Sequence, residues 1–172
     1  MTAEALGVEL AIVRPGMVYG PRSGGWTVGI LRTVQRGVPT LFGKADGNAF
    51  PVYIDNLCDL LILCAVRPQA AGEAFNAVDP PVSWGQFFGY YAKMSAKKPR
   101  RLPLALARLI VLANRLLNLG LRITNDRLNY YQTKTVYPTD KAARLLDYAP
   151  RIDIDEGMRR SEAWLHRSGE LA

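Results

Sequence analysis

The feature that most constrains the fold is an alternation of short apolar runs with amphipathic stretches between residues 8 and 94. The run at 8–13 (VELAIV) is rich in β-branched residues and is closed by Arg14-Pro15-Gly16, which predicts a buried strand followed by a turn. Further strands are expected at 40–43, 52–54 and 74–78, and helices at 26–36, 55–66 and 84–94. Because strands and helices alternate at these lengths, the sequence predicts an α/β protein with a parallel sheet.

Polar residues mark the starts of several predicted helices. Ser83 and Gln86 have the Ser-x-x-Gln spacing of a capping box, and Asp55 can cap the helix that follows it. After residue 97 the pattern becomes almost entirely helical, and Asp153 with Glu156 provides the start signal of a last helix at 155–167. The other helices are expected at 102–121, 125–134 and 139–146. We therefore divide the chain into an α/β part, 1–92, and a mostly helical part, 93–172.

Positive charge is concentrated in one stretch of the chain. The sequence holds 22 Lys and Arg against 15 Asp and Glu, a net charge of +7. Residues 93–127 hold one acid, Asp126, and nine basic residues: Lys93, Lys97, Lys98, Arg100, Arg101, Arg108, Arg115, Arg122 and Arg127. Such a stretch suits a phosphate-bearing ligand, an anionic bilayer or simply a solvated surface. No aromatic residues are interleaved and no recognition motif accompanies it, so we expect no nucleic-acid partner.

The apolar segment at 104–121 is interrupted by Arg108 and Arg115, which lie seven residues apart on one helix face. This pattern favours an amphipathic helix over a membrane span. We expect it to line a substrate pocket or to pack on the domain, and peripheral membrane contact through 97–121 is the alternative. No signal-peptide pattern follows Met1, and Cys58 and Cys64 are expected to be buried thiols, so we expect a cytoplasmic protein.

Several common catalytic motifs are absent from the sequence. None of the 15 glycines is two or three positions from another, which excludes a dinucleotide fingerprint and a P-loop. His166 is the only histidine, so we expect no metal site and no histidine-based triad. The Tyr130…Lys134 and Tyr137…Lys141 spacings would place a phenol beside an ammonium on a helix. With eight tyrosines these matches are expected by chance, and Pro138 opposes a helix at the second pair, so no catalytic residue is assigned.

Five sequence blocks, in order, resemble one known family. They are 12–22 (IVRPGMVYGPR), 51–57 (PVYIDNL), 72–78 (GEAFNAV), 139–150 (TDKAARLLDYAP) and Glu156-Gly157. Together they resemble the extended short-chain dehydrogenase/reductase superfamily, of the NAD-dependent epimerase/dehydratase type, although Asp147 replaces a glycine usual there. The segment 99–108 (PRRLPLALAR) is similar to the 3β-hydroxysteroid dehydrogenase-like branch.

The resemblance implies the C-terminal half of a Rossmann-like parallel-sheet domain, followed by a helical substrate-binding region. In the family, the glycine loop and the catalytic Tyr-x-x-x-Lys lie in the N-terminal half, so this chain alone is expected to be inactive and to bind NAD or NADP weakly. The residues expected near the cofactor are Pro15, Gly16, Met17 and Val18. The residues expected near the substrate are Met17, Tyr19, Arg22 and Tyr53.

Two departures from the family pattern bear on the substrate. Nucleotide-sugar enzymes of the family usually have Asn at the position of Met17 and Arg near that of Ala49. Losing these polar anchors favours a small apolar substrate, steroid-like or isoprenoid-like, oxidised or reduced at a hydroxyl or carbonyl. The alternatives are a nucleotide-sugar epimerase or dehydratase that uses Arg22 or the basic stretch, and a non-catalytic scaffold or membrane-docking protein. Half of a parallel sheet leaves an apolar edge, so we also expect self-association, for example as a homodimer.

Overall fold

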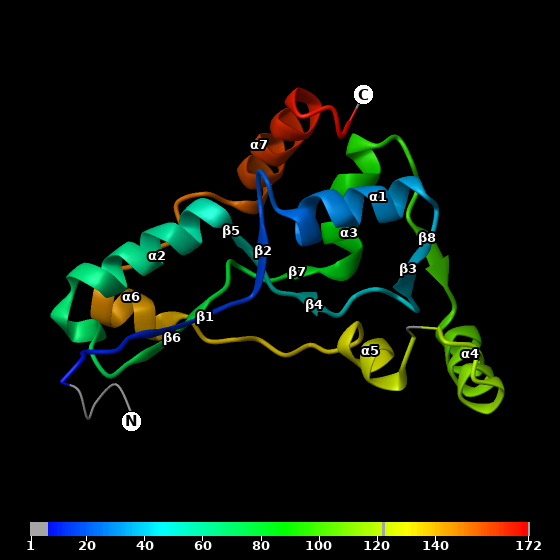
Figure 1. The fold of residues 1–172 in the computed structure, drawn as a ribbon, viewed down its shortest axis with the longest axis horizontal. Helices are drawn as coiled ribbons and strands as arrows, with labels where there is room; N and C mark the ends of the chain where they lie inside the picture. Colours follow the sequence, from blue (N-terminus) through cyan, green and yellow to red (C-terminus); the bar gives the residue numbers. More distant parts are fainter. Residues whose placement is uncertain (1–6, 122, 172) are drawn as a thin grey trace.

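The computed structural model of the protein describes residues 7–121 and 123–171, and the first four residues, on which the signal-peptide prediction rests, lie outside them (Figure 1). The strands are β1 Ile12–Pro15, β2 Met17–Tyr19, β3 Pro39–Phe42, β4 Asn48–Ala49, β5 Pro51–Tyr53, β6 Ala74–Ala77, β7 Val82–Ser83 and β8 Arg100–Leu102. The α-helices are α1 Ile30–Gln35, α2 Ile54–Val66, α3 Trp84–Met94, α4 Leu104–Leu117, α5 Asn125–Tyr130, α6 Asp140–Leu146 and α7 Ile154–Arg167.

One extended segment forms β1 and β2 and changes its neighbour at Gly16. β1 pairs in parallel with β6, whereas β2 pairs in parallel with β5. The Gly16 amide donates to the Ala77 carbonyl at 3.0 Å, and the next amide, of Met17, donates to the Phe50 carbonyl at 2.7 Å. A Cβ atom at Gly16 would overlap the Phe50 carbonyl oxygen and would lie 2.8 Å from Val78 Cγ1. The change of neighbour therefore requires glycine at this position.

The remaining strand pairs are short, and helices flank them. β3 pairs in parallel with β8, and β4 pairs antiparallel with β7. α1 and α3 lie side by side, while α2 and α6 lie beside β1 and β6 at the other end of the molecule (Figure 1). The predicted α/β class with parallel strand pairing is confirmed.

Two groups of buried side chains form the core. The larger group surrounds Tyr19 and Trp84 and joins the β2 region to α1, α3 and α7. The smaller group lies between α2, α6 and the β5–β6 region, and includes Leu60 and Phe75. Since α6 and α7 pack back on elements of the first 92 residues, the two halves of the chain share one core. The functional division at residue 92 stays a prediction.

Asn56, fully buried at the start of α2, connects three segments. Its Oδ1 accepts from the amides of Arg151 and Ile152 at 3.1 and 3.0 Å, and its Nδ2 donates to the Ile152 carbonyl at 2.8 Å. Nδ2 also donates to Asp79 Oδ1 at 2.9 Å, and Asp79 Oδ2 accepts from the Tyr53 amide at 2.7 Å. Burial raises the pKa of Asp79 to about 6. These bonds fix the end of β5 against the chain that leads into α7.

The predicted helix starts are confirmed at two places and wrong at a third. Ser83 and Gln86 form the expected reciprocal capping box, and Asp153 Oδ1 accepts from the Glu156 amide at 2.9 Å. Asp55, however, does not cap α2, because the helix begins one residue earlier and Tyr53 occupies the cap position. Asp55 lies in the first turn instead, where its charge favours the positive end of the helix dipole.

The first predicted strand is displaced and is not buried. β1 begins at Ile12, whose side chain is 46% exposed, rather than at residue 8. The prediction fails because β1 has one described neighbour, β6, so its other edge and part of its face meet solvent. Cys58 is likewise exposed and Cys64 is partly exposed on α2, so the prediction of buried thiols is wrong.

Candidate functional site

A cavity of about 560 Å³ opens where the extended segment changes neighbour. Its volume lies within the range of about 300–1,000 Å³ that small-molecule sites occupy. Crevices at the carboxyl ends of parallel strands, at a point where strand order switches, are the usual ligand sites of open α/β sheets. The lining residues are Arg14, Pro15, Gly16, Met17, Trp26, Phe50, Asn76, Val78, Tyr130 and Tyr137.

Four aromatic rings from three segments of the chain form much of the wall. Trp26 lies in a π-helical segment, Gly24–Gly29, whose start is capped by Ser23. Phe50 lies between β4 and β5, and its ring centroid is 4.6 Å from that of Tyr137, edge to face. The ring of Tyr130, at the end of α5, is 6.5 Å from that of Phe50. The wall therefore offers flat apolar surfaces for a ring system.

The described lining is poor in charge. Arg14 supplies the one charged side chain, and Asn76 has its Nδ2 committed to the Pro138 carbonyl at 3.0 Å. Burial raises the pKa of Tyr130, which keeps its phenol protonated. The cavity can hold a mainly apolar molecule and can donate hydrogen bonds from phenols, but the lining contains no carboxylate to act as a base.

The structure brings together three of the residues predicted near the cofactor. Pro15, Gly16 and Met17 all line the cavity, and Met17 is 3% exposed. Val18 does not line it, because its side chain packs against the smaller core group.

The other residues predicted near the substrate lie outside this cavity. Tyr19 and Tyr53 are fully buried in the core, with their ring centroids 5.4 Å apart, and burial raises the pKa of both phenols. Arg22 is exposed in the turn after β2, with a φ of 67°. The structure therefore brings Met17 together with the aromatic wall and not with these three residues.

Neither Tyr-x-x-x-Lys spacing forms a phenol–ammonium pair. α5 ends at Tyr130, and Lys134 instead lies 3.1 Å from Asp46 Oδ2. Tyr137 precedes α6, and Lys141 contacts Glu73 and lies 5.6 Å from the centre of the Phe75 ring. The prediction that these spacings arise by chance agrees with this geometry.

Sequence reasoning missed the aromatic wall. In the sequence, Tyr130 and Tyr137 stand out only through their Tyr-x-x-x-Lys spacings, and no motif marks Trp26 or Phe50 as a pocket residue. The segment that carries the two tyrosines reaches the cavity because Asn48 Nδ2 donates to the Lys134 and Thr135 carbonyls, at 3.2 and 2.9 Å, over a long chain separation. No local pattern indicates such a contact.

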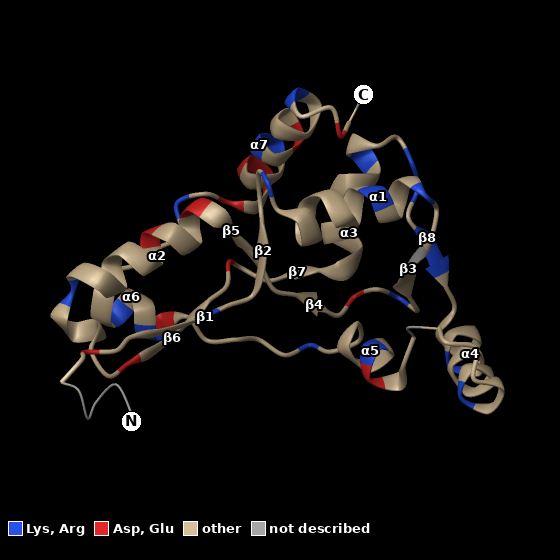
Figure 2. Cartoon of the chain, viewed as in Figure 1, with Lys and Arg blue, Asp and Glu red and all other residues tan. Residues whose placement is uncertain are grey.

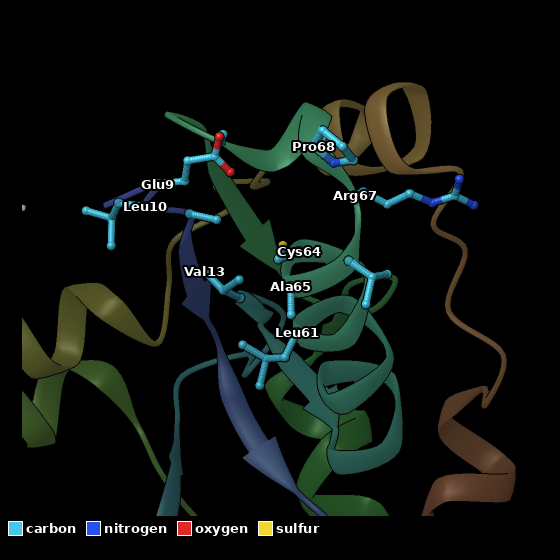
Figure 3. A pocket seen from close by; sticks show the side chains of 11 residues that line it. Glu9, Leu10, Val13, Leu61, Cys64, Ala65, Arg67 and Pro68 are labelled. Atoms are coloured by element: carbon cyan, nitrogen blue, oxygen red, sulfur yellow. The ribbon is translucent and has the colours of Figure 1, made fainter. Parts of the chain in front are cut away.

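A second, shallower groove of about 550 Å³ lies at the free edge of β1. Figure 3 shows Val13 of β1 and Leu61 and Cys64 of α2 on its two sides. In a parallel ladder alternate residues bond to the same neighbour, and the Ile12 and Gly16 amides bond toward β6. Ala11 and Val13 therefore turn their backbone groups toward this groove, which has the form of an open sheet edge.

No protein-family model matches the chain, but curated relatives do. A UDP-glucose 4-epimerase of Vibrio cholerae is 37% identical over 73 residues, 42% of this chain and 22% of its own length. A 3beta-hydroxysteroid-dehydrogenase/decarboxylase of Arabidopsis thaliana is 26% identical over 90% of this chain and 40% of its own length. A 2-alkyl-3-oxoalkanoate reductase of Shewanella oneidensis is 26% identical over 95% of this chain and 46% of its own length.

Solved structures show the same fold. The UDP-glucose 4-epimerase of Thermotoga maritima, solved with UDP-glucose, superposes with a TM-score of 0.70 at 18% identity, over 96% of this chain and 48% of that one. The UDP-glucuronic acid 4-epimerase of Bacillus cereus, solved with UDP-glucuronic acid and NAD, gives 0.67 at 18% identity, over 96% and 48%. The fold is that of Rossmann-like epimerase and dehydratase domains.

The chain is thus a relative of the NAD-dependent epimerase/dehydratase proteins of the extended short-chain dehydrogenase/reductase superfamily. It spans about half or less of the length of the curated relatives that it matches. The sequence blocks described above resemble the C-terminal half of that family.

Proposed function

We propose that this chain is the substrate-binding part of an NAD(P)-dependent oxidoreductase that acts on a hydroxyl or carbonyl of an apolar, steroid-like or isoprenoid-like molecule. The observation that carries the proposal is the aromatic cavity around Met17, placed where the strand order switches. The relatives include a 3beta-hydroxysteroid-dehydrogenase/decarboxylase and a 2-alkyl-3-oxoalkanoate reductase, and these names support a substrate with a large hydrocarbon part.

The residues Pro15, Gly16 and Met17 suit the nicotinamide end of a dinucleotide. Gly16 lines the cavity without a side chain, because the Phe50 carbonyl and Val78 fill the space that a Cβ atom would need. Pro15, Gly16 and Met17 would face the nicotinamide, which supplies hydride exchange when bound. The sequence contains no glycine loop for the pyrophosphate, so phosphate binding and the Tyr/Lys pair are assigned to a segment other than this one.

The chain's own contribution is to position the substrate and exclude water. Met17 presents a thioether where an amide would hydrogen-bond a sugar, and the rings of Trp26, Phe50 and Tyr137 offer apolar contact. Ala49, the second departure from nucleotide-sugar enzymes, is fully buried in the core, so it provides no anchor for a nucleotide. Burying an apolar ligand here is favourable by about 25 cal/mol per Å² removed from water.

A nucleotide-sugar epimerase or dehydratase is the second candidate function. It is favoured by the 37% identity to the Vibrio cholerae epimerase and by the fold shared with epimerases solved with UDP-sugars. In that case Arg14, at the rim of the cavity, is the side chain that the structure offers to a diphosphate.

The two candidates are separated by titrating the chain with a 3-ketosteroid and with UDP-glucose, following tryptophan fluorescence because Trp26 lines the cavity. We expect saturable quenching by the ketosteroid. Met17→Asn should weaken ketosteroid binding by about tenfold, since an unpaired buried amide costs about 1–3 kcal/mol.

Val136→Asn is the matched control, because Val136 is exposed, adjoins Tyr137 and does not line this cavity. It should leave ketosteroid binding unchanged. Tight binding of UDP-glucose, together with no binding of the ketosteroid, would overturn the preferred function in favour of the second candidate. Absence of any quenching, or equal loss in both variants, would refute the assignment of this cavity as the substrate site.

A further inference from the structure

We propose that α4, together with the basic stretch that precedes it, docks on the surface of a lipid bilayer that contains anionic lipid. The helix would lie in the plane of the interface, with its leucines among the acyl chains and the neighbouring Lys and Arg side chains among the phosphates. This surface is separate from the aromatic cavity, and the inference is independent of the reaction proposed above.

α4 exposes an unusual amount of apolar surface. Of its 14 residues, Ala107 alone is buried, although the sequence predicted a helix that packs on the domain or lines a pocket. Leu109, Leu112 and Leu116 are 60%, 52% and 73% exposed, and their i, i+3, i+7 spacing places them on one face. The other exposed leucines of this region are Leu106, Leu117, Leu119 and Leu121.

The position and length of α4 suit a helix that lies on a membrane. It projects from the body of the molecule at the end opposite α2 and α6 (Figure 1). The 14 residues of α4 extend about 21 Å, whereas a spanning helix needs roughly 20 residues to cross a hydrocarbon layer about 30 Å thick. None of the described helices is long and apolar enough to cross a bilayer.

The charges around α4 point to an anionic surface as the occupant. Seven exposed cations between residues 93 and 115 form no ion pair with any described residue, and Figure 2 shows the basic residues on β8 and α4. They are Lys93, Lys97, Lys98, Arg100, Arg101, Arg108 and Arg115. Elsewhere paired and unpaired cations are mixed with acids, as where Arg32 pairs with Glu170 and Arg151 with Asp59, whereas residues 93–115 contain no Asp or Glu. Arg122 lies outside the described residues.

Leucines and cations occur on the same helix in the arrangement that an interface favours. Arg108 and Arg115 lie one heptad apart along one border of the exposed leucine face. Their long side chains can extend from that border toward phosphates while the leucines stay in the apolar layer. Lys and Arg side chains held near an anionic leaflet are attracted to its phosphates, so the seven exposed cations together favour binding.

The test is flotation of the whole chain with vesicles, which separates bound protein from aggregates that sediment. Vesicles of phosphatidylcholine alone are compared with vesicles of phosphatidylcholine and phosphatidylglycerol in equal amounts. We expect flotation with the anionic vesicles and its loss as salt is raised from about 0.1 M to about 1 M, where the Debye length falls from about 10 Å to about 3 Å. Lys97→Glu plus Lys98→Glu, and separately Leu109→Gln plus Leu116→Gln, should each lower the bound fraction at least about tenfold.

Two control variants make the same changes elsewhere on the exposed surface. Arg67→Glu plus Arg167→Glu alters the net charge equally, and Leu61→Gln plus Ile62→Gln removes exposed apolar side chains of α2. Both controls should float like the unaltered chain. Equal binding to both vesicle types, no binding to either, or equal losses in test and control variants would each overturn the proposal. If the leucine variant instead changes only self-association in sedimentation velocity, the face contacts a second copy and the proposal is likewise wrong.

Discussion

Gly157, in the first turns of α7, packs directly on the two tyrosines that the sequence assigned to the substrate. A Cβ atom at this position would overlap the Tyr19 hydroxyl, and would lie 3.0 Å from Tyr19 Cζ and 2.9 Å from Tyr53 Cδ2. Both rings are fully buried and pack edge to face at 5.4 Å, and Tyr19 also packs on Phe87 at 5.9 Å. The rings therefore have no free space into which they could move.

Gly157→Ala should lower the free energy of unfolding by about 2 kcal/mol. Alanine in a helix interior gains about 1 kcal/mol over glycine, but overpacking a filled core costs about 1–3 kcal/mol, and here two rings are displaced. For a chain of this size the loss corresponds to a fall in Tm of roughly 4–8 °C. The measurement is urea unfolding, followed by circular dichroism and tryptophan fluorescence.

Gly89→Ala is the matched control, because Gly89 also lies within a helix, α3, and a Cβ there meets nothing within 4 Å. This variant should gain about 1 kcal/mol. Tyr19→Phe should restore part of the loss in Gly157→Ala, since it removes the overlapping oxygen. That hydroxyl has no hydrogen-bond partner among the described residues, so its removal costs little by itself. If Gly157→Ala and Gly89→Ala have the same stability, the packing of α7 on these rings is refuted.

Three further outcomes test other parts of the structure. The pKa of Asp79 in the folded chain, about 6, exceeds its ordinary value of 3.8, so protonation favours the folded state. About 3 kcal/mol of stability present near pH 4 should therefore be lost as the pH rises through 6. Asp79→Asn should flatten this dependence of the urea midpoint on pH, and an unchanged dependence would contradict the assignment. Asn56→Ala leaves the amides of Arg151 and Ile152 without their acceptor and should lower the free energy of unfolding by about 3 kcal/mol, measured by chemical denaturation. A loss below about 1 kcal/mol would show that water replaces the side chain. Ile12→Lys plus Leu61→Lys adds charge on β1 and on the α2 side of the edge groove, and should reduce the self-association expected of an open sheet edge. Sedimentation velocity profiles identical to those of the unaltered chain would count against that edge as the contact.

The elements that local signals determine were predictable from the sequence. The capping box of Ser83 and Gln86 and the Asp153 cap depend on residues three positions apart, and both occur as expected. The α/β class could be predicted because strand-like and helix-like patterns of apolar residues alternate along the chain, and these patterns do not depend on distant contacts. The assignment of Pro15–Met17 to a ligand site rested on the family resemblance and on their place after a strand, and it stays a prediction.

Features that depend on distant partners were not predictable. Ile12 was expected to be buried, but burial of a strand depends on how many neighbours it acquires, and β1 has one among the described residues. Tyr53 was expected in the pocket because its sequence block resembles a family motif, yet α7 packs on it and encloses it in the core. Tyr130 reaches the cavity through a chain return that leaves no local pattern in the sequence.

One part of the candidate pocket's surface is fixed, because Gly16 tolerates no side chain where the strand passes from one neighbour to the next. Substitution can therefore do little to reshape that surface without breaking the sheet itself. The rings of the wall come from three segments, and two of these are joined by the Asn48 hydrogen bonds and by the contact of Phe50 with Tyr137. Substitutions among the rings therefore alter the shape of the cavity more readily than a substitution at Gly16 does.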